Sequence, residues 1–191
     1  MLNYEIVEKI HTSTIWNNVI LKVKVKGKEK IYILKLYAGI NGGFQKLVFN
    51  REMEALKVLN ACEGIVKIRD TSTSLRYNKE GNYGAILMDY VEGKTLDHYN
   101  WNQFSALRKY EICYKILQAV HNAHSNNVIH RDIKPQNIIY DDVKNEITII
   151  DFGASKIKTI IDKATTMPMF SENYSAPEVI KGNDITEKCD Y

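Results

Sequence analysis

Three oxygen-bearing side chains in the middle of the chain could together carry out phosphoryl transfer. Asp132 lies within the run HRDIKPQN at 130–137, and the tripeptide DFG begins fourteen residues after Asn137, at Asp151. In phosphoryl transfer, one carboxylate orients the attacking hydroxyl and accepts its proton, while an amide oxygen and a second carboxylate hold the metal ions that bridge the phosphates. Asp132, Asn137 and Asp151 suit these three roles, so their types and spacing predict a phosphoryl-transfer site.

The stretch from Val128 to Gly153 resembles the catalytic loop and metal-binding motif of eukaryotic-type protein kinases. Lys134, two residues after Asp132, is typical of the serine/threonine kinases in that family. The resemblance implies ATP and Mg²⁺ as cofactors. Asp132 and Lys134 would then be catalytic residues, and Asn137 and Asp151 would be the magnesium ligands.

The resemblance also implies a fold class, which is α+β and two-lobed, of the protein-kinase-like kind. The N-lobe would hold an antiparallel sheet and one long helix. The C-lobe would be mainly helical and incomplete at its C-terminus, because Asp190 matches the first residue of a central helix on which the family builds this lobe. A partner or a missing C-terminal segment would cover the apolar surface left there. The expected boundaries are 1–88 for the N-lobe, 89–93 for the hinge, and 94–191 for the partial C-lobe with its catalytic loop, metal-binding motif and activation segment.

The sequence pattern of residues 19–37 predicts a β-hairpin. Residues 19–37 alternate apolar and polar side chains with a period of two on either side of Gly27-Lys28, which is typical of two antiparallel strands joined by a turn. The lysines of the first strand could form an anion-binding or nucleic-acid patch. A solvated strand face whose charges discourage edge pairing is the favoured interpretation.

A helix is predicted over residues 44–60, and Glu52 lies within its apolar stripe. A carboxylate is costly to bury without a cation, and Lys35 of the hairpin is the expected partner. Glu54 is the poorer candidate because it lies about 200° around the helix from Glu52, at 100° per residue. By resemblance, Lys35 and Glu52 would be the pair that positions the ATP phosphates.

The short apolar strand 85–88 leads into a glycine-containing bend that resembles the kinase hinge. The resemblance places Met88 at the gatekeeper position. It also implies that the backbone carbonyl of Asp89 and the backbone groups of Val91 hydrogen-bond the adenine edge of ATP.

Two histidines near the catalytic loop are expected to be structural. Residues 105–126 predict a long amphipathic helix with Cys113, Ile116, Leu117, Val120 and His124 on one side. His124 is expected to be a packed, hydrogen-bonded imidazole rather than a metal ligand or base, since no second ligand lies at helical spacing. By resemblance, His130 packs under the phenylalanine of DFG and is not the general base.

The segment between DFG and Ala176-Pro177-Glu178 resembles an activation loop. Arg131 precedes the catalytic aspartate, and kinases with this arginine commonly pair it with a phosphorylated loop residue. Thr165 or Thr166 is the hypothesised phosphorylation site, with a plain solvated loop as an equal alternative. Ser171 matches the family's substrate-contacting hydroxyl.

Composition excludes little but narrows the setting. The apolar fraction of 45% and charged fraction of 26% are those of an ordinary globular protein, and a net charge of +3 indicates no nucleic-acid partner. The three cysteines are odd in number and lack a Cys-x-x-Cys pair, so neither a disulfide framework nor a zinc site is expected. A reducing, cytoplasmic location is therefore favoured. No apolar run approaches the roughly 18 residues of a membrane span, so neither a membrane association nor a cleaved leader is expected.

The leading hypothesis is ATP-dependent phosphorylation of serine or threonine on protein substrates. The alternatives are a catalytically weak or inactive kinase-like binding or regulatory module, a truncated fragment, and, less favoured, a small-molecule phosphotransferase. The second hypothesis arises because the segment 10–19, which should cover the nucleotide, contains no glycine. Lys134 and the tripeptide at 176–178 count against the small-molecule hypothesis, because they accompany peptide substrates in the family.

Overall fold

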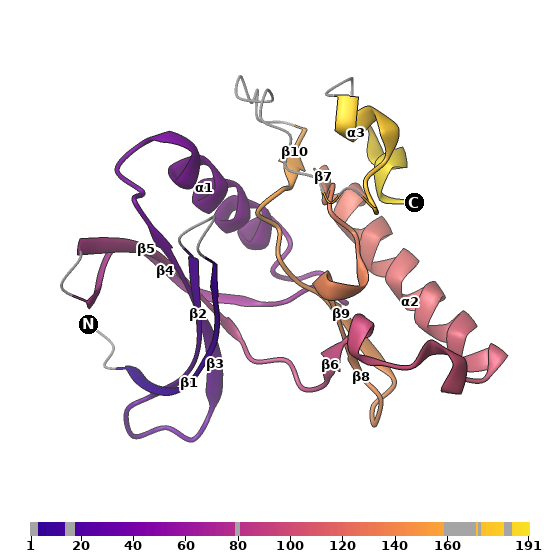
Figure 1. Ribbon diagram of the computed structural model, residues 1–191, viewed down its shortest axis with the longest axis horizontal. Helices are drawn as coiled ribbons and strands as arrows, with labels where there is room; N and C mark the ends of the chain where they lie inside the picture. The colour runs from indigo at the N-terminus through magenta and orange to yellow at the C-terminus, as the bar shows by residue number, and fades with distance from the viewer. Residues whose placement is uncertain (1–3, 14–17, 79–80, 159–170, 172, 182–184) are drawn as a thin grey trace. The chain divides into compact units, whose positions relative to one another are not determined.

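The computed structural model describes residues 4–13, 18–78, 81–158, 171, 173–181 and 185–191 (Figure 1). Within these ranges the chain forms two compact units. The first unit comprises residues up to Met53 together with 67–90, and the second comprises 54–66 together with 91–191. Helix α1 (Gly43–Val58) begins in the first unit, and its last residues belong to the second.

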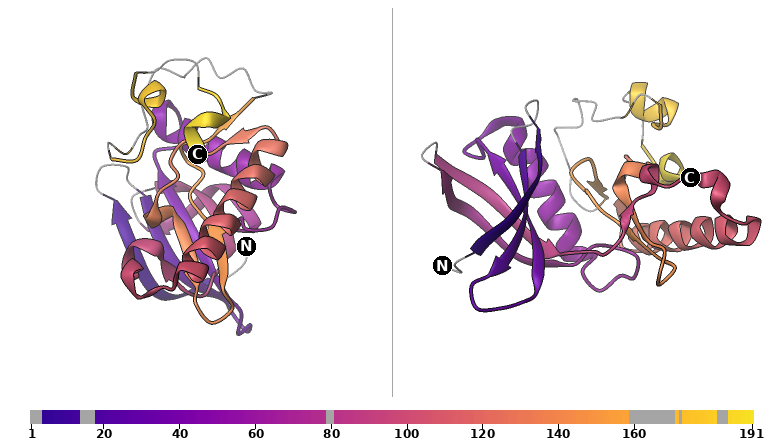
Figure 2. Two further views of the ribbon diagram at one scale, coloured as in Figure 1. Left: turned by 90° about the vertical axis from the view of Figure 1, so that its right-hand side faces the viewer. Right: turned by 60° about the horizontal axis from the view of Figure 1, so that its bottom comes forward.

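The first unit is built on a five-stranded antiparallel sheet with the strand order β1-β2-β3-β5-β4. Helix α1 lies against one face of this sheet (Figures 1 and 2). The predicted hairpin is present as β2 and β3, and Gly27 at its turn has φ +81°, a conformation that glycine adopts without strain. The strands are β1 (Tyr4–Ser13), β2 (Asn18–Val25), β3 (Ile31–Ala38), β4 (Ile68–Asn78) and β5 (Gly81–Asp89).

Strand β3 separates an apolar face from a polar one. Leu34 and Leu36 are buried in an apolar cluster with side chains of β2 and β5. Since side chains in a strand alternate between faces, Lys35 and Tyr37 point to the opposite side, toward α1. Helix α1 in turn buries Val48, Glu52 and Leu56, and Leu59 is buried directly after its end; these four residues are the stripe that the sequence predicts.

The described residues of the second unit form one long helix, two small sheets and several short turns. Strands β6, β8 and β9 form one sheet, and β10 pairs with β7 in the other. The elements are β6 (Lys94–Thr95), η1 (Leu96–His98), η2 (Trp101–Gln103), α2 (Ala106–Ser125), β7 (Val128–Ile129), η3 (Pro135–Asn137), β8 (Ile138–Asp141), β9 (Glu146–Ile149), β10 (Lys156–Ile157), α3 (Pro177–Lys181) and η4 (Glu187–Asp190).

Helix α2 begins where the sequence predicts, because the Ser105 hydroxyl accepts a hydrogen bond of 3.1 Å from the backbone N–H of Arg108 and caps the first turn. Its buried face differs from the predicted one. Cys113 and Leu117 of the predicted apolar side are exposed. Helix α2 packs on β7 and β9 through the face that carries Ile112, Ala119, Val120 and Ala123.

Helix α2 also leaves a row of large apolar side chains exposed. Leu107 and Tyr110 are each 67% exposed, and Tyr114 and Leu117 follow along the same helix. The rings of Tyr110 and Tyr114 stack with centroids 6.3 Å apart. None of the helices in the described parts of the chain is long and apolar enough to cross a membrane.

Candidate active site

The predicted catalytic residues meet in the loop between β7 and β8. The Lys134 ammonium lies 2.7 Å from Asp132 Oδ2, and it donates a hydrogen bond of 2.8 Å to the Ser171 hydroxyl. The Ser171 hydroxyl in turn donates to Asp132 Oδ1 over 2.7 Å. One carboxylate oxygen therefore binds an ammonium while the other accepts a hydrogen bond from an aliphatic hydroxyl. This is the arrangement required for a carboxylate that orients a hydroxyl nucleophile.

Asn137 is held in a defined orientation by the same loop. Its Nδ2 donates to the backbone carbonyl of Asp132 at 2.8 Å and to the Asp132 carboxylate at 2.9 Å. Pro135 begins the short η3 turn, where its missing N–H costs nothing, and this turn places Asn137 beside Asp132. Since Nδ2 is used for these bonds, Oδ1 is the side-chain atom of Asn137 that can serve a metal ion.

Asp151 is tied to Asn137 through the backbone. The N–H of Ile150 donates to the carbonyl of Asn137 over 2.8 Å. This bond fixes the backbone of Asn137 beside the residue that precedes Asp151. Asp151 has φ +62°, a left-handed conformation that is uncommon outside glycine and often marks functional positions. Amide and carboxylate oxygens are the ligands that Mg²⁺ prefers, and Mg²⁺ usually takes only one or two carboxylates from a protein. Asn137 and Asp151 fit this ion.

His130 is a packing residue, as expected. Its ring meets the buried ring of Phe152 edge to face, with centroids 4.6 Å apart. Nδ1 accepts from the backbone N–H of Asp132 at 3.2 Å, and Nε2 lies 3.2 Å from the carbonyl of Ile150, to which it can donate. Only a neutral imidazole can accept at Nδ1. Burial agrees with this assignment, because it lowers the pKa of His130 by penalising the charged form.

Arg131 is buried and holds the residues that follow the DFG tripeptide. Its guanidinium donates to the carbonyl of Ala154 and, at 3.2 Å, to that of Ser155. The residues hypothesised as its phosphorylated partners, Thr165 and Thr166, lie outside the described residues.

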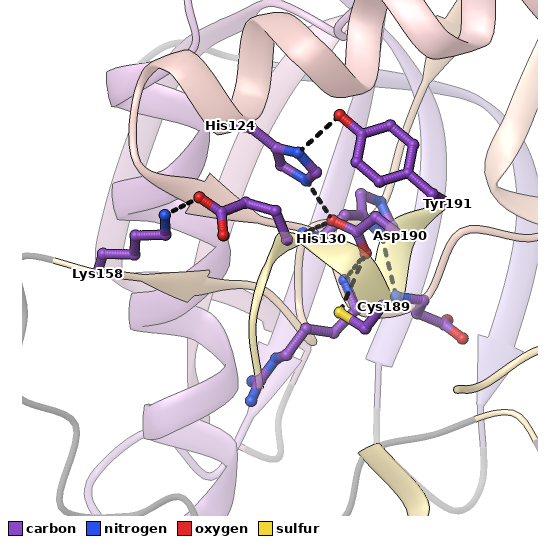
Figure 3. Close-up of polar contacts among 9 residues, drawn as sticks. His124, His130, Lys158, Cys189, Asp190 and Tyr191 are labelled. Atoms are coloured by element: carbon purple, nitrogen blue, oxygen red, sulfur yellow. Dashed lines mark hydrogen bonds and ion pairs between the residues drawn. The ribbon is translucent and has the colours of Figure 1, made fainter. Parts of the chain in front are cut away.

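The structure adds a residue that sequence reasoning did not assign to the site. The Asp190 carboxylate accepts a hydrogen bond of 2.8 Å from the backbone N–H of His130 (Figure 3). It accepts a second, of 2.7 Å, from the backbone N–H of Arg131. It also contacts His124 Nε2 at 2.8 Å, and the other nitrogen of that ring lies 3.2 Å from the Tyr191 hydroxyl. His124 is therefore a packed, hydrogen-bonded imidazole, as predicted. Asp190 matched a motif, but its role required a contact sixty residues away, for which no local pattern exists.

The first unit contains the predicted pair of Lys35 and Glu52. The ammonium lies 2.8 Å from Oε2 and 3.0 Å from Oε1. Glu52 is 0% exposed and Lys35 is 6% exposed, so the charges compensate each other away from water. Glu54 instead pairs with the exposed Lys57 at 3.2 Å. The stripe of α1 thus identified the correct carboxylate.

Tyr37 is a second residue that sequence reasoning missed. Its hydroxyl donates to Glu52 Oε2. A usable signal was present, because Tyr37 lies two residues after Lys35 and so on the same face of the strand.

The predicted hinge residues lie at and after the end of β5. Met88 is buried at the end of β5. The amide of Asp89 donates to the carbonyl of Lys67 at 2.9 Å, and its carboxylate binds Arg69 and, at 3.1 Å, Lys30. The hydrogen bond from Arg69 lowers the pKa of Asp89. The adenine contacts expected from Asp89 and Val91 involve backbone atoms and remain a prediction.

Residues 17–191 match the family model described as the protein kinase domain. The chain belongs to this family. Among curated proteins it is 30% identical over 146 residues to ribosomal protein S6 kinase 2 alpha of Xenopus laevis, covering 74% of this chain and 19% of that protein. It is 33% identical over 145 residues to the serine/threonine-protein kinase PrkC of Bacillus subtilis strain 168, covering 74% and 21%. The chain thus spans about a fifth of the length of these relatives.

A solved structure supports the same fold. The PK-1 kinase of the Cydia pomonella granulovirus matches with a TM-score of 0.71 and 23% sequence identity, over 98% of this chain and 63% of that one. The predicted family and the two-lobed protein-kinase-like fold class are confirmed.

Proposed function

We propose that this chain catalyses ATP-dependent phosphorylation of serine or threonine residues on protein substrates. The observation that carries the proposal is the contact of Asp132 and Lys134 with the Ser171 hydroxyl. A serine hydroxyl at this place has its hydrogen directed to a carboxylate and its oxygen beside an ammonium. A substrate hydroxyl held in the same way would be oriented for attack, with its proton accepted by Asp132.

The remaining residues suit the other requirements of the reaction. Lys134 would neutralise charge that develops on the transferring phosphoryl group. Asn137 Oδ1 and Asp151 would hold Mg²⁺, which supplies charge neutralisation for the phosphates when it is bound. Lys35, oriented by Glu52, would bind the inner phosphates of ATP.

The hinge assignment belongs to the same proposal. Residues 89–93 would connect an N-lobe at 1–88 to a C-lobe at 94–191, and the backbone of Asp89 and Val91 would bind adenine. A reducing, cytoplasmic setting is proposed because Cys62, Cys113 and Cys189 are all free thiols.

The test is transfer of labelled γ-phosphate from ATP to a generic protein substrate in the presence of Mg²⁺. Asp132→Asn should reduce the transfer rate by at least about 100-fold, which is the usual loss when a general base is removed. Asp142→Asn is the matched control, because Asp142 is an exposed carboxylate in the turn after β8. Equal rates for the wild-type chain and Asp132→Asn would refute the proposal.

A kinase-like module that binds nucleotide without transfer is the second candidate. It is favoured by the absence of glycine from segment 10–19, since side chains there hinder close approach of backbone amides to phosphates. Thermal stabilisation by Mg-ATP that is lost in Lys35→Ala, without phosphate transfer in the wild-type chain, would select this candidate.

A further inference from the structure

Tyr37 shares one face of β3 with Lys35. The intervening Leu36 is 0% exposed in the apolar cluster on the other side of the sheet. Tyr37 itself is 0% exposed, so its phenol is removed from water and requires a hydrogen-bond partner inside the protein. That partner is the carboxylate of Glu52, which is also 0% exposed.

The Glu52 carboxylate therefore receives two donors from one strand. Lys35 binds both oxygens, and the Tyr37 hydroxyl donates to Oε2. The Lys35 ammonium also lies 5.5 Å from the centroid of the Tyr37 ring. The Lys35 ammonium stands on a longer stem with more rotatable bonds than the Tyr37 hydroxyl, which is carried by a packed ring, so the phenol restricts the position of the carboxylate more strongly. The hydroxyl thus supplies the rigid point of this three-residue arrangement.

The ring of Tyr37 is held in place by its neighbours. Phe49 of α1 meets it edge to face, with centroids 5.5 Å apart and an interplanar angle of 65°. The residue opposite Tyr37 on β5 is Gly84. A Cβ at position 84 would lie 3.0 Å from Phe49 Cδ2 and 3.1 Å from two atoms of Ile40. Because Gly84 has no side chain, Phe49 has room to pack against Tyr37.

We infer that Tyr37 is a positioning residue, whose hydroxyl orients Glu52 and, through it, the Lys35 ammonium. The inference rests on the proposed function, in which this ammonium binds the phosphates of ATP. Both donors and the acceptor belong to the first unit, so this unit holds the pair together with its own residues.

The test variant is Tyr37→Phe, which removes one oxygen and keeps the ring against Phe49. A hydrogen bond to a charged group that is lost should lower kcat/KM for ATP by about 10-fold. The matched control is Tyr32→Phe on the same strand, because Tyr32 packs on the opposite, apolar face. The control should stay within about twofold of the wild-type chain.

A double-mutant cycle separates positioning from a general loss of stability. In a Glu52→Gln background the charge that the phenol orients is absent, so Tyr37→Phe should lower kcat/KM by less than about twofold further. Equal effects of Tyr37→Phe in the two backgrounds would overturn the inference.

Amide hydrogen exchange of α1 gives a readout that needs no catalysis. Peptides that cover residues 48–56 should exchange about fivefold faster in Tyr37→Phe than in the wild-type chain or Tyr32→Phe. If the wild-type chain transfers no phosphate, the proposed function fails and this comparison alone decides the inference. Unchanged exchange in Tyr37→Phe would overturn it. Gly84→Ala is a second variant, which presses on Phe49 and should accelerate exchange in the same peptides.

Discussion

Replacing Asp190 by asparagine should destabilise the second unit strongly. The carboxylate is 0% exposed and accepts hydrogen bonds from two backbone N–H groups, those of His130 and Arg131, as well as contacting His124 Nε2. Asparagine keeps a single oxygen and points an NH₂ group at one of these donors. At least one buried donor then loses its acceptor, and the other bonds lose the assistance of the charge.

The magnitude follows from these contacts. A buried donor left without an acceptor costs about 1 to 3 kcal/mol, and a hydrogen bond to a charged group is worth about 1.5 to 3 kcal/mol. Together they predict a loss of about 2.5 to 6 kcal/mol, a large share of the roughly 5 to 15 kcal/mol that ordinarily stabilises a domain. Arg131 adds to the effect, because its φ of +68° is an uncommon conformation that the Asp190 contact helps to hold.

The assay is urea unfolding followed by circular dichroism, with Glu187→Gln as the matched control. Glu187 lies in the same η4 turn and pairs with Lys158, but both side chains are 37% exposed. Such a pair is worth at most about 1 kcal/mol. The reasoning is refuted if Asp190→Asn lowers the free energy of unfolding by no more than Glu187→Gln does.

Three further results are expected. His130→Phe should make the chain lose less stability on acidification. Burial lowers the pKa of His130, so below about pH 6.5 the unfolded chain binds a proton that the folded chain does not bind. In the wild-type chain this lowers the free energy of unfolding by up to about 1.4 kcal/mol per pH unit. Unfolding at pH 7.5 and 5.5 measures this, and an equal slope in the variant would contradict it. Iodoacetamide at pH 8 should label the exposed Cys113 but not Cys189 in the native chain, since burial and then Asp190 raise the pKa of the Cys189 thiol to about 12; mass spectrometry that found both labelled at one rate would rule this out. Gly93→Ala should cost more than about 2 kcal/mol in urea unfolding, because φ is +111° and a Cβ would lie 2.2 Å from the carbonyl oxygen of Tyr140; a wild-type midpoint would disprove the clash.

The Asp190 contact also explains how the catalytic loop keeps its form. His130 and Arg131 direct their N–H groups to one carboxylate, while their side chains go to the carbonyls of Ile150 and of Ala154 and Ser155. The two residues that precede Asp132 are therefore held through both their backbone N–H groups and their side chains. If Asp132 is the general base, as proposed, it gains from these contacts, because the efficiency of a general base depends on holding the carboxylate within hydrogen-bond reach of a hydroxyl.

Local pattern was sufficient for several features of the fold. The hairpin of β2 and β3 and the spans of α1 and α2 follow from periodicity and a turn glycine, each of which acts within a few residues. The same periodicity selected Glu52 over Glu54, because only a burial stripe distinguishes them. Pattern was insufficient for the orientation of α2. Leu117 is apolar yet exposed, because the position of the strands that pack on a helix determines which of its apolar side chains are covered.

The sequence alone determined the chemistry available to this protein: which carboxylates, amide and ammonium groups it has, at which spacing, and on which side of a strand or helix they lie. The tertiary structure decided which of those groups hold one another. Tyr37 joins Glu52, and Asp190 joins His130, through contacts between segments 15 and 60 residues apart. Residue types and periods act over a few residues, whereas a buried hydrogen bond depends on where distant segments pack. Only the folded chain contains that information.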